Sequence, residues 1–169
     1  PRQRVHSTIS PRSRNLASAI DVIKPSMATS SAASKYMLLW CRMPSTSITL
    51  INNAGVMACP QSYTTDDLEM QIGTNHFGHF LLGNLLAPAL EAGAKGAGKP
   101  SRLVSLSSIG HRRSDINWED VNYVTRPYDK WESYGQAKTA NALFAVGFHT
   151  RFKDSWITAN AVMPGGTMS

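Results

Sequence analysis

The sequence predicts an α/β domain with a parallel sheet, on two observations. Three short β-prone runs, residues 48–51, 102–106 and 156–162, alternate with two longer helical patterns, residues 68–90 and 133–152. In such an alternation each helix returns the chain to the level where the previous strand began, so the next strand runs parallel to it. The first two runs are followed at once by amide or small residues, and the third is followed, after Met163, by Pro-Gly-Gly. Such residues are typical of the end of a buried strand.

The first helical pattern follows the small and amide residues that end the first strand. It is predicted to begin after Thr65, because the acidic residues that come next favour a helix N-terminus: Asp66, Asp67 and Glu69. Apolar residues then recur at helical spacing and form one face: Ile72, Phe77, Phe80, Leu81, Leu85 and Leu86. Residues 93–100, rich in Gly and Lys, are predicted to be a loop.

The second strand is followed by Ser107 and Ser108 and then by a long polar connection over residues 109–132. Long connections within compact domains are usually functional or disordered. Ser133 is predicted to cap the second helix. The third strand ends before the Pro-Gly-Gly turn at residues 164–166.

Candidate binding residues lie at the ends of these strands. The carboxyl ends of parallel strands share one edge of a sheet, and ligands bind there. We therefore expect Asn52, Ser108, Pro164 and Gly165 to lie along one edge.

The second helix contributes a Tyr–Lys pair. Tyr134 and Lys138 are four residues apart and share one helical face. A cation beside a phenol favours the phenolate and lowers its pKa from the ordinary value of about 10. The pair is therefore a candidate proton donor and acceptor.

The net charge of +6 lies wholly in the N-terminal part. Residues 1–48 contain seven Lys or Arg and one acid, whereas residues 49–169 contain ten of each sign. The basic, Ser/Arg-rich segment 1–47 is predicted to be a vestigial βα unit (residues 5–9 and 15–23), with a transit peptide as the alternative. The neutral body has no basic stripe, so we expect no nucleic-acid partner.

The remaining composition is that of one ordinary domain. No apolar run approaches the roughly 18 residues of a membrane span. Cys41 and Cys59 show neither metal nor disulfide spacing, which predicts reduced thiols and a cytoplasmic protein. His76 and His79 lack a third metal ligand nearby in the sequence and are expected to be core or interface residues.

Five ordered motifs resemble the short-chain dehydrogenase/reductase family. They are Asn52-Asn53-Ala54-Gly55, Asn75 in a Thr-Asn-His-Phe-Gly run, Ser107-Ser108, Tyr134-x-x-x-Lys138 and Pro164-Gly165. Within this family, the runs at residues 75–82 and 134–141 are similar to the retinol dehydrogenase-like branch. The resemblance covers residues 48–169. It implies the catalytic half of a partial Rossmann fold, a doubly wound parallel sheet.

The resemblance also implies NAD(P)-dependent interconversion of an alcohol and a carbonyl. Tyr134 would be the proton donor or acceptor, and Lys138 would lower the pKa of that phenol and hold the nicotinamide ribose. Ser108 would hydrogen-bond the substrate oxygen, and Asn75 would support a water-linked proton path. The other cofactor-binding residues would be Asn52, Ala54, Gly55, Pro164, Gly165 and Thr167.

The resemblance further implies NADP ahead of NAD, through Arg12 or Arg14, and a small-molecule or lipophilic alcohol or ketone as substrate. A homodimer would form through the two long helices. Two departures from the family favour a chain truncated at both ends. Residues 1–47 contain no glycine, hence no first strand with a Gly-rich pyrophosphate loop, and the chain ends before the helices of a substrate lid. The alternative function is therefore a catalytically inactive remnant that acts as an interaction module.

Overall fold

The computed structural model describes residues 46–165. The predictions for residues 1–45 and 166–169 lie outside the described residues. They include the vestigial βα unit, Arg12, Arg14 and the cofactor residue Thr167.

The described chain forms a parallel sheet with the strand order β1-β2-β3. Its strands are β1 (Thr49–Asn52), β2 (Ser101–Leu106) and β3 (Ile157–Val162). Each predicted strand is present with its start shifted by one residue, which is within the usual uncertainty of strand ends. The predicted α/β fold with a parallel sheet is confirmed.

The helical region between β1 and β2 differs from the prediction at both ends. It consists of α3 (Met70–Ile72), the π-helix η1 (Gly73–Phe77) and α4 (Gly78–Ala97). The predicted start after Thr65 is wrong, because the carboxylate of Glu69 caps α3 and accepts the first free N–H groups.

The predicted loop at residues 93–100 is also wrong over its first half. The helix α4 continues through Gly93 and ends only at Gly98, which has φ 62° in the left-handed region. Gly93 lies against the segment that precedes β1, since an added Cβ would come within 2.8 Å of the Thr46 carbonyl oxygen. Close packing, and not loop formation, accounts for this glycine.

The helix between β2 and β3 is α5 (Lys130–Phe152), and it begins before the predicted cap. Asp129 caps it by accepting the N–H groups of Trp131 and Glu132. Ser133 is buried in the first turn, where its own N–H donates to the Asp129 carbonyl, so the predicted Ser133 cap is wrong. The polar connection before α5 contains the 3-10 helix η2 (Ile109–Arg113), and η3 (Lys153–Ser155) links α5 to β3.

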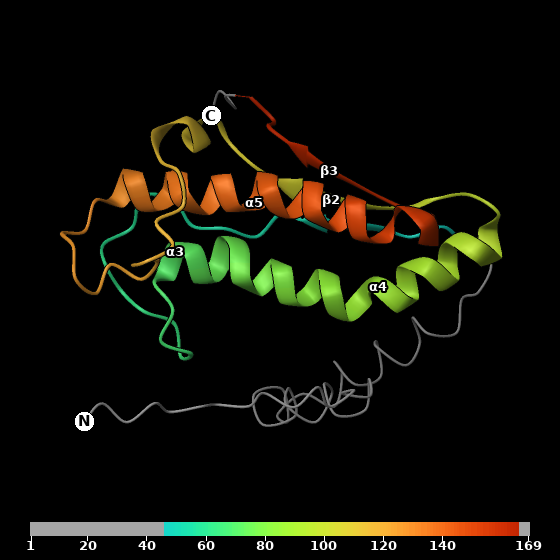
Figure 1. Cartoon of the computed structure of the whole chain (residues 1–169), viewed down its shortest axis with the longest axis horizontal. Helices are drawn as coiled ribbons and strands as arrows, with labels where there is room; N and C mark the ends of the chain where they lie inside the picture. Colours follow the sequence, from blue (N-terminus) through green and yellow to red (C-terminus); the bar gives the residue numbers. More distant parts are fainter. Residues whose placement is uncertain (1–45, 166–169) are drawn as a thin grey trace, which may run out of the picture. The chain divides into compact units, whose positions relative to one another are not determined.

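Helices α4 and α5 run side by side along the sheet (Figure 1), and the ring centroids of Phe80 and Phe144 lie 5.2 Å apart between them. Gly83 of α4 permits this approach, because a Cβ there would lie 3.0 Å from both Leu103 and Phe144. The buried core between the helices and the sheet consists of Ala87, Leu90, Leu103, Phe144, Phe148, Ile157 and Ala159. Burial of each large side chain contributes roughly 1.5–3 kcal/mol, which anchors both helices on the sheet.

Within residues 46–165 we find no helix that combines the length and the apolar character needed to cross a membrane.

Candidate active site

Three predicted catalytic residues meet where β2 ends and α5 begins. Lys138 Nζ lies 5.5 Å from the centroid of the Tyr134 ring. Gly110 lies between Ser108 and Tyr134: an added Cβ would be 2.8 Å from two carbons of the Tyr134 ring and 3.5 Å from Ser108 Oγ. A side chain at Gly110 would push the ring away, so this glycine allows the serine and the tyrosine to be neighbours.

Lys138 is the buried member of this group, with 7% of its surface exposed. Its Nζ donates to the Leu106 carbonyl oxygen at 3.0 Å, which fixes the ammonium at the carboxyl end of β2. Burial lowers the pKa of Lys138 from its ordinary value. An ammonium has three N–H groups, so hydrogen-bonding capacity remains for a ligand.

Ser108 is held by the turn that follows it. Its backbone is extended (φ −160°, ψ 159°), and its Oγ accepts the N–H of Gly110 at 3.2 Å at the start of η2. Accepting this bond does not use the hydroxyl hydrogen. Ser108 can therefore donate to an oxygen placed beside Tyr134.

Asn75 is fully buried within the π-helix η1. Its amide exchanges two hydrogen bonds with the backbone of Val56: Val56 N–H donates to Oδ1 at 2.8 Å, and Nδ2 donates to the Val56 carbonyl at 2.9 Å. The amide thus secures the segment after β1 and is not directed at a ligand. Gly55 belongs to the same contact, since a Cβ there would be 2.9 Å from Asn75 Oδ1.

Two histidines of this region lie against α5 and against Asn75. His79 Nδ1 is 2.9 Å from the Asn75 carbonyl oxygen, and His76 Nδ1 is 3.2 Å from Asn141 Oδ1. Both partner oxygens only accept, so each Nδ1 carries a proton. Burial lowers the pKa of both rings, and the nearby charge of Lys138 lowers that of His79 further. Among residues 46–165 no cluster of three metal-ligating side chains occurs.

The predicted cofactor residues lie in different environments. Ala54, Gly55, Pro164 and Gly165 are exposed beyond the carboxyl ends of β1 and β3. Asn52 is 1% exposed, and its amide has no hydrogen-bond partner among the described residues. The buried Asn52 amide lacks a hydrogen-bond partner, and Lys138 has N–H groups that are not used. Both features fit the binding of a polar ligand group at this edge of the sheet.

A partly buried polar network around Tyr128 is absent from the sequence prediction. The Tyr128 hydroxyl lies 3.2 Å from Glu69 Oε1 and 3.0 Å from the Cys59 carbonyl, and Gln71 Nε2 donates to it at 3.0 Å. Burial raises the pKa of Tyr128 to about 12. Nothing in the spacing of these residues indicates the network, because its members are up to 69 positions apart.

The polar connection over residues 114–129 is likewise ordered by its own hydrogen bonds. The Asp120 carboxylate accepts the N–H groups of Val124, Thr125 and Arg126, and these bonds, that from Val124 above all, lower its pKa to about 2. Trp118 remains 75% exposed at this loop.

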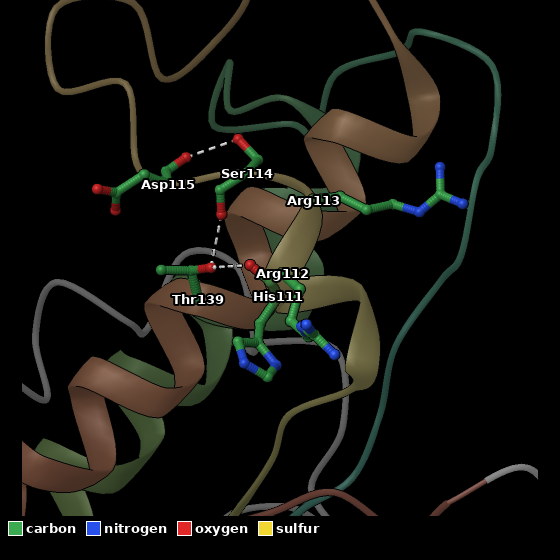
Figure 2. Close-up of a pocket in the computed structure, with 6 residues that line it drawn as sticks. All are labelled: His111, Arg112, Arg113, Ser114, Asp115 and Thr139. Atoms are coloured by element: carbon green, nitrogen blue, oxygen red, sulfur yellow. Dashed lines mark hydrogen bonds between the residues drawn. The ribbon is translucent and has the colours of Figure 1, made fainter.

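The sequence prediction also omits the residues that seat η2 on α5. Gly135 and Thr139 each follow one member of the Tyr134–Lys138 pair, so they share a neighbouring face of the same helical turns. Figure 2 shows Thr139 with its hydroxyl directed at the backbone of η2, beside a shallow pocket lined by η2 and the residues after it. A small residue and a hydroxyl at this i, i+4 spacing are the signal that could have identified this contact.

Sequence comparison finds relatives that match the described body. Over 116 residues, 69% of this chain and 34% of the relative, the chain is 47% identical to human retinol dehydrogenase 13. It is 41% identical over 120 residues, 69% of this chain and 38% of the relative, to the chloroplastic short-chain dehydrogenase TIC 32 A of Brassica napus. The chain thus spans little more than a third of these curated relatives. No protein-family model matches it.

Solved structures share the fold. An uncharacterised protein from Mycobacterium paratuberculosis aligns with a TM-score of 0.64 and 40% identity, over 78% of this chain and 46% of that protein. A Brucella ovis oxidoreductase of the short-chain dehydrogenase/reductase family, in complex with a partially ordered NAD, aligns with a TM-score of 0.55 and 20% identity, over 91% of this chain and 61% of that chain.

The sheet, its two covering helices and these neighbours define a partial Rossmann fold. The chain belongs to the short-chain dehydrogenase/reductase family, in its retinol dehydrogenase-like branch.

Proposed function

We propose that this chain carries the catalytic residues of an NAD(P)-dependent oxidoreductase that interconverts an alcohol and a carbonyl. The observation that supports this most is the meeting of Ser108, Tyr134 and Lys138 at the carboxyl end of β2, with Gly110 between the serine and the tyrosine. Tyr134 gives a proton to the carbonyl oxygen, or takes one from the alcohol. The ammonium of Lys138 lies beside the phenol that exchanges this proton, with Nζ 5.5 Å from the centroid of the Tyr134 ring.

Ser108 and Asn75 have supporting roles in this proposal. Ser108 donates its free hydroxyl hydrogen to the substrate oxygen, where negative charge develops. The Asn75 backbone carbonyl accepts from His79 Nδ1 and keeps a second lone pair, which would support a water-linked proton path beside Lys138. The bound nicotinamide would supply or accept the hydride.

Lys138 would hold the nicotinamide ribose with its unused N–H groups. The exposed segments after β1 and β3, with Ala54, Gly55, Pro164 and Gly165, would line the cofactor groove together with the buried Asn52 at the end of β1. Thr167, which lies outside the described residues, is proposed for the same groove. We propose NADP as the preferred cofactor and NAD as the alternative. The relatives named retinol dehydrogenases support a lipophilic alcohol or its carbonyl as substrate.

A homodimer through α4 and α5 is the proposed assembly. Large apolar side chains stay exposed on these helices, with 53% of Leu81, 51% of Leu143 and 66% of Val146 accessible. Exposed apolar patches of this kind mark protein contacts. The mass of the chain in solution tests this, and a monomer at high concentration rejects it.

The function is tested by titrating the purified chain with NADPH and following nicotinamide fluorescence. We expect saturable binding in the micromolar range. Lys138→Met keeps the length of the side chain and removes the ammonium, so it should weaken binding about 10- to 100-fold. The matched control is Lys153→Met, which replaces an exposed lysine of η3 and should bind as the unchanged chain does. No binding up to millimolar cofactor rejects catalysis and supports the inactive remnant.

A further inference from the structure

The turn η2 is hydrogen-bonded to Ser108 through His111. The Ser108 carbonyl oxygen lies 3.0 Å from the backbone N of His111 and 2.6 Å from its ring Nδ1. A carbonyl oxygen only accepts, so Nδ1 carries the proton and the imidazole is held as one tautomer. Two donors from one residue thus fix the orientation of the Ser108 peptide group.

The other end of η2 is fastened to α5. Thr139 Oγ1 lies 3.0 Å from the His111 carbonyl oxygen and 2.7 Å from that of Ser114, as the dashed lines in Figure 2 show. Below this contact, a Cβ added to Gly135 would come within 2.8 Å of the Gly110 carbonyl oxygen. The turn therefore lies directly on the helix that carries Tyr134 and Lys138.

These contacts bear on the distance between the serine and the tyrosine. Ser108 Oγ accepts the N–H of Gly110, and Gly110 touches the Tyr134 ring. A shift or rotation of η2 would change both contacts at once. Small displacements of a reacting group are costly, because a rate depends on near-attack geometry.

We propose that His111 and Thr139 are positioning residues, which hold η2 between Ser108 and α5 and so place the Ser108 hydroxyl at the substrate oxygen beside Tyr134. Neither residue touches the reacting atoms in this proposal. It rests on the proposed function, because it concerns the geometry of that same site.

Paired substitutions at His111 and Thr139 test these contacts. The measured quantity is the turnover of an alcohol substrate by the full chain. His111→Ala removes the ring bond to the Ser108 carbonyl, and Thr139→Val removes the hydroxyl that bonds to the His111 and Ser114 carbonyls. Each should lower kcat about tenfold, with KM within about twofold. His111→Asn keeps a donor at the place of Nδ1, and Thr139→Ser keeps the hydroxyl, so both should restore most of kcat. Arg112→Ala, on the same turn, is the control and should leave kcat unchanged.

A second readout separates positioning from general stabilisation. If both residues act through η2, the fold-reduction of kcat in the double variant His111→Ala/Thr139→Val should be smaller than the product of the two single fold-reductions. Heteronuclear NMR of the free chain should show the His111 ring protonated at Nδ1. A ring protonated only at Nε2, kcat unchanged in the Ala and Val variants, or equal losses in the Asn and Ser variants overturns the inference alone. No turnover in the unchanged chain overturns the proposed function, and the inference with it.

Discussion

The two halves of α5 pack against the same sheet by different means. In the first half two small apolar residues, Ala137 and Ala140, are buried, and the longer buried side chains are polar. These polar side chains bond to backbone groups of other segments: Lys138 and Asn141 both donate to the Leu106 carbonyl at 3.0 Å. Gln136 accepts from Asn117 N–H at 3.0 Å and donates to the Val121 carbonyl at 3.0 Å. In the second half Phe144, Phe148 and Phe152 stack along the helix.

The two halves of α5 therefore contribute differently to the positions of the site residues and to the stability of the fold. A buried hydrogen bond adds only about 1 kcal/mol net to the free energy of unfolding, but it forms only when donor and acceptor have the right distance and angle. Apolar burial is larger and not directional. The first half therefore fixes the positions of Tyr134 and Lys138, while the second half supplies the free energy that keeps α5 on the sheet. Substitutions in the two halves should have opposite effects on activity and stability.

The largest expected effect is that of Tyr134→Phe in the polar half. Loss of the acid–base hydroxyl should lower kcat about 10²- to 10⁴-fold. The free energy of unfolding should change by less than about 0.5 kcal/mol, because the ring and its contact with Gly110 remain. Steady-state kinetics and urea unfolding measure the two quantities.

The matched control removes the same atom from a structural tyrosine. The Tyr128 hydroxyl bonds to Glu69, Gln71 and the Cys59 carbonyl, so Tyr128→Phe should cost about 1–2 kcal/mol of stability and leave kcat near its original value. Equal kinetic losses in both variants would mean that Tyr134 has no special chemical role.

The next effect is that of Phe148→Ala in the apolar half. Phe148 is 3% exposed, and its ring lies 5.4 Å from Phe144 and 4.5 Å from Phe152 between centroids. Truncation should lower the free energy of unfolding by about 3–5 kcal/mol. Where the variant is still folded, kcat should be close to that of the unchanged chain. Thr150→Ala, at an exposed position of the same half, should lower the free energy of unfolding by less than about 0.5 kcal/mol. A similar loss in Phe148→Ala and Thr150→Ala would mean that the apolar half does not stabilise the chain through its buried rings.

Sequence reasoning predicted the second half of α5 better than the first. The three strands and the end of α5 near Phe152 follow from local patterns of residue type. The apolar face predicted within residues 68–90 is only partly buried, because Phe80 and Leu81 stay 46% and 53% exposed. The start of α5 depends on Asp129, and the position of Ser133 does not distinguish a cap from a buried first-turn residue. The π-helix η1 and the Asn75–Val56 contact depend on partners 19 positions apart, which no local pattern encodes. The motif residues were predicted through the family resemblance, whereas His111 and Thr139 emerge only from the packing of η2 on α5.

The smallest expected effect is a pH dependence from His76 and His79, which lie beside Asn141 and Lys138 of the polar half. Burial lowers the pKa of His76 and His79 from 6.5, so below that pH the unfolded chain binds more protons than the folded chain. The free energy of unfolding should therefore be unaffected by these rings above about pH 6.5 and fall as the pH decreases, by less than about 1.4 kcal/mol per pH unit for each histidine. Urea unfolding from pH 8 to about pH 5 measures this slope. His79→Asn keeps a donor for the Asn75 carbonyl and cannot titrate, so it should reduce the slope. An unchanged slope in His79→Asn would mean that this ring is not held neutral by the fold, and that proton binding next to Lys138 does not distinguish the two halves.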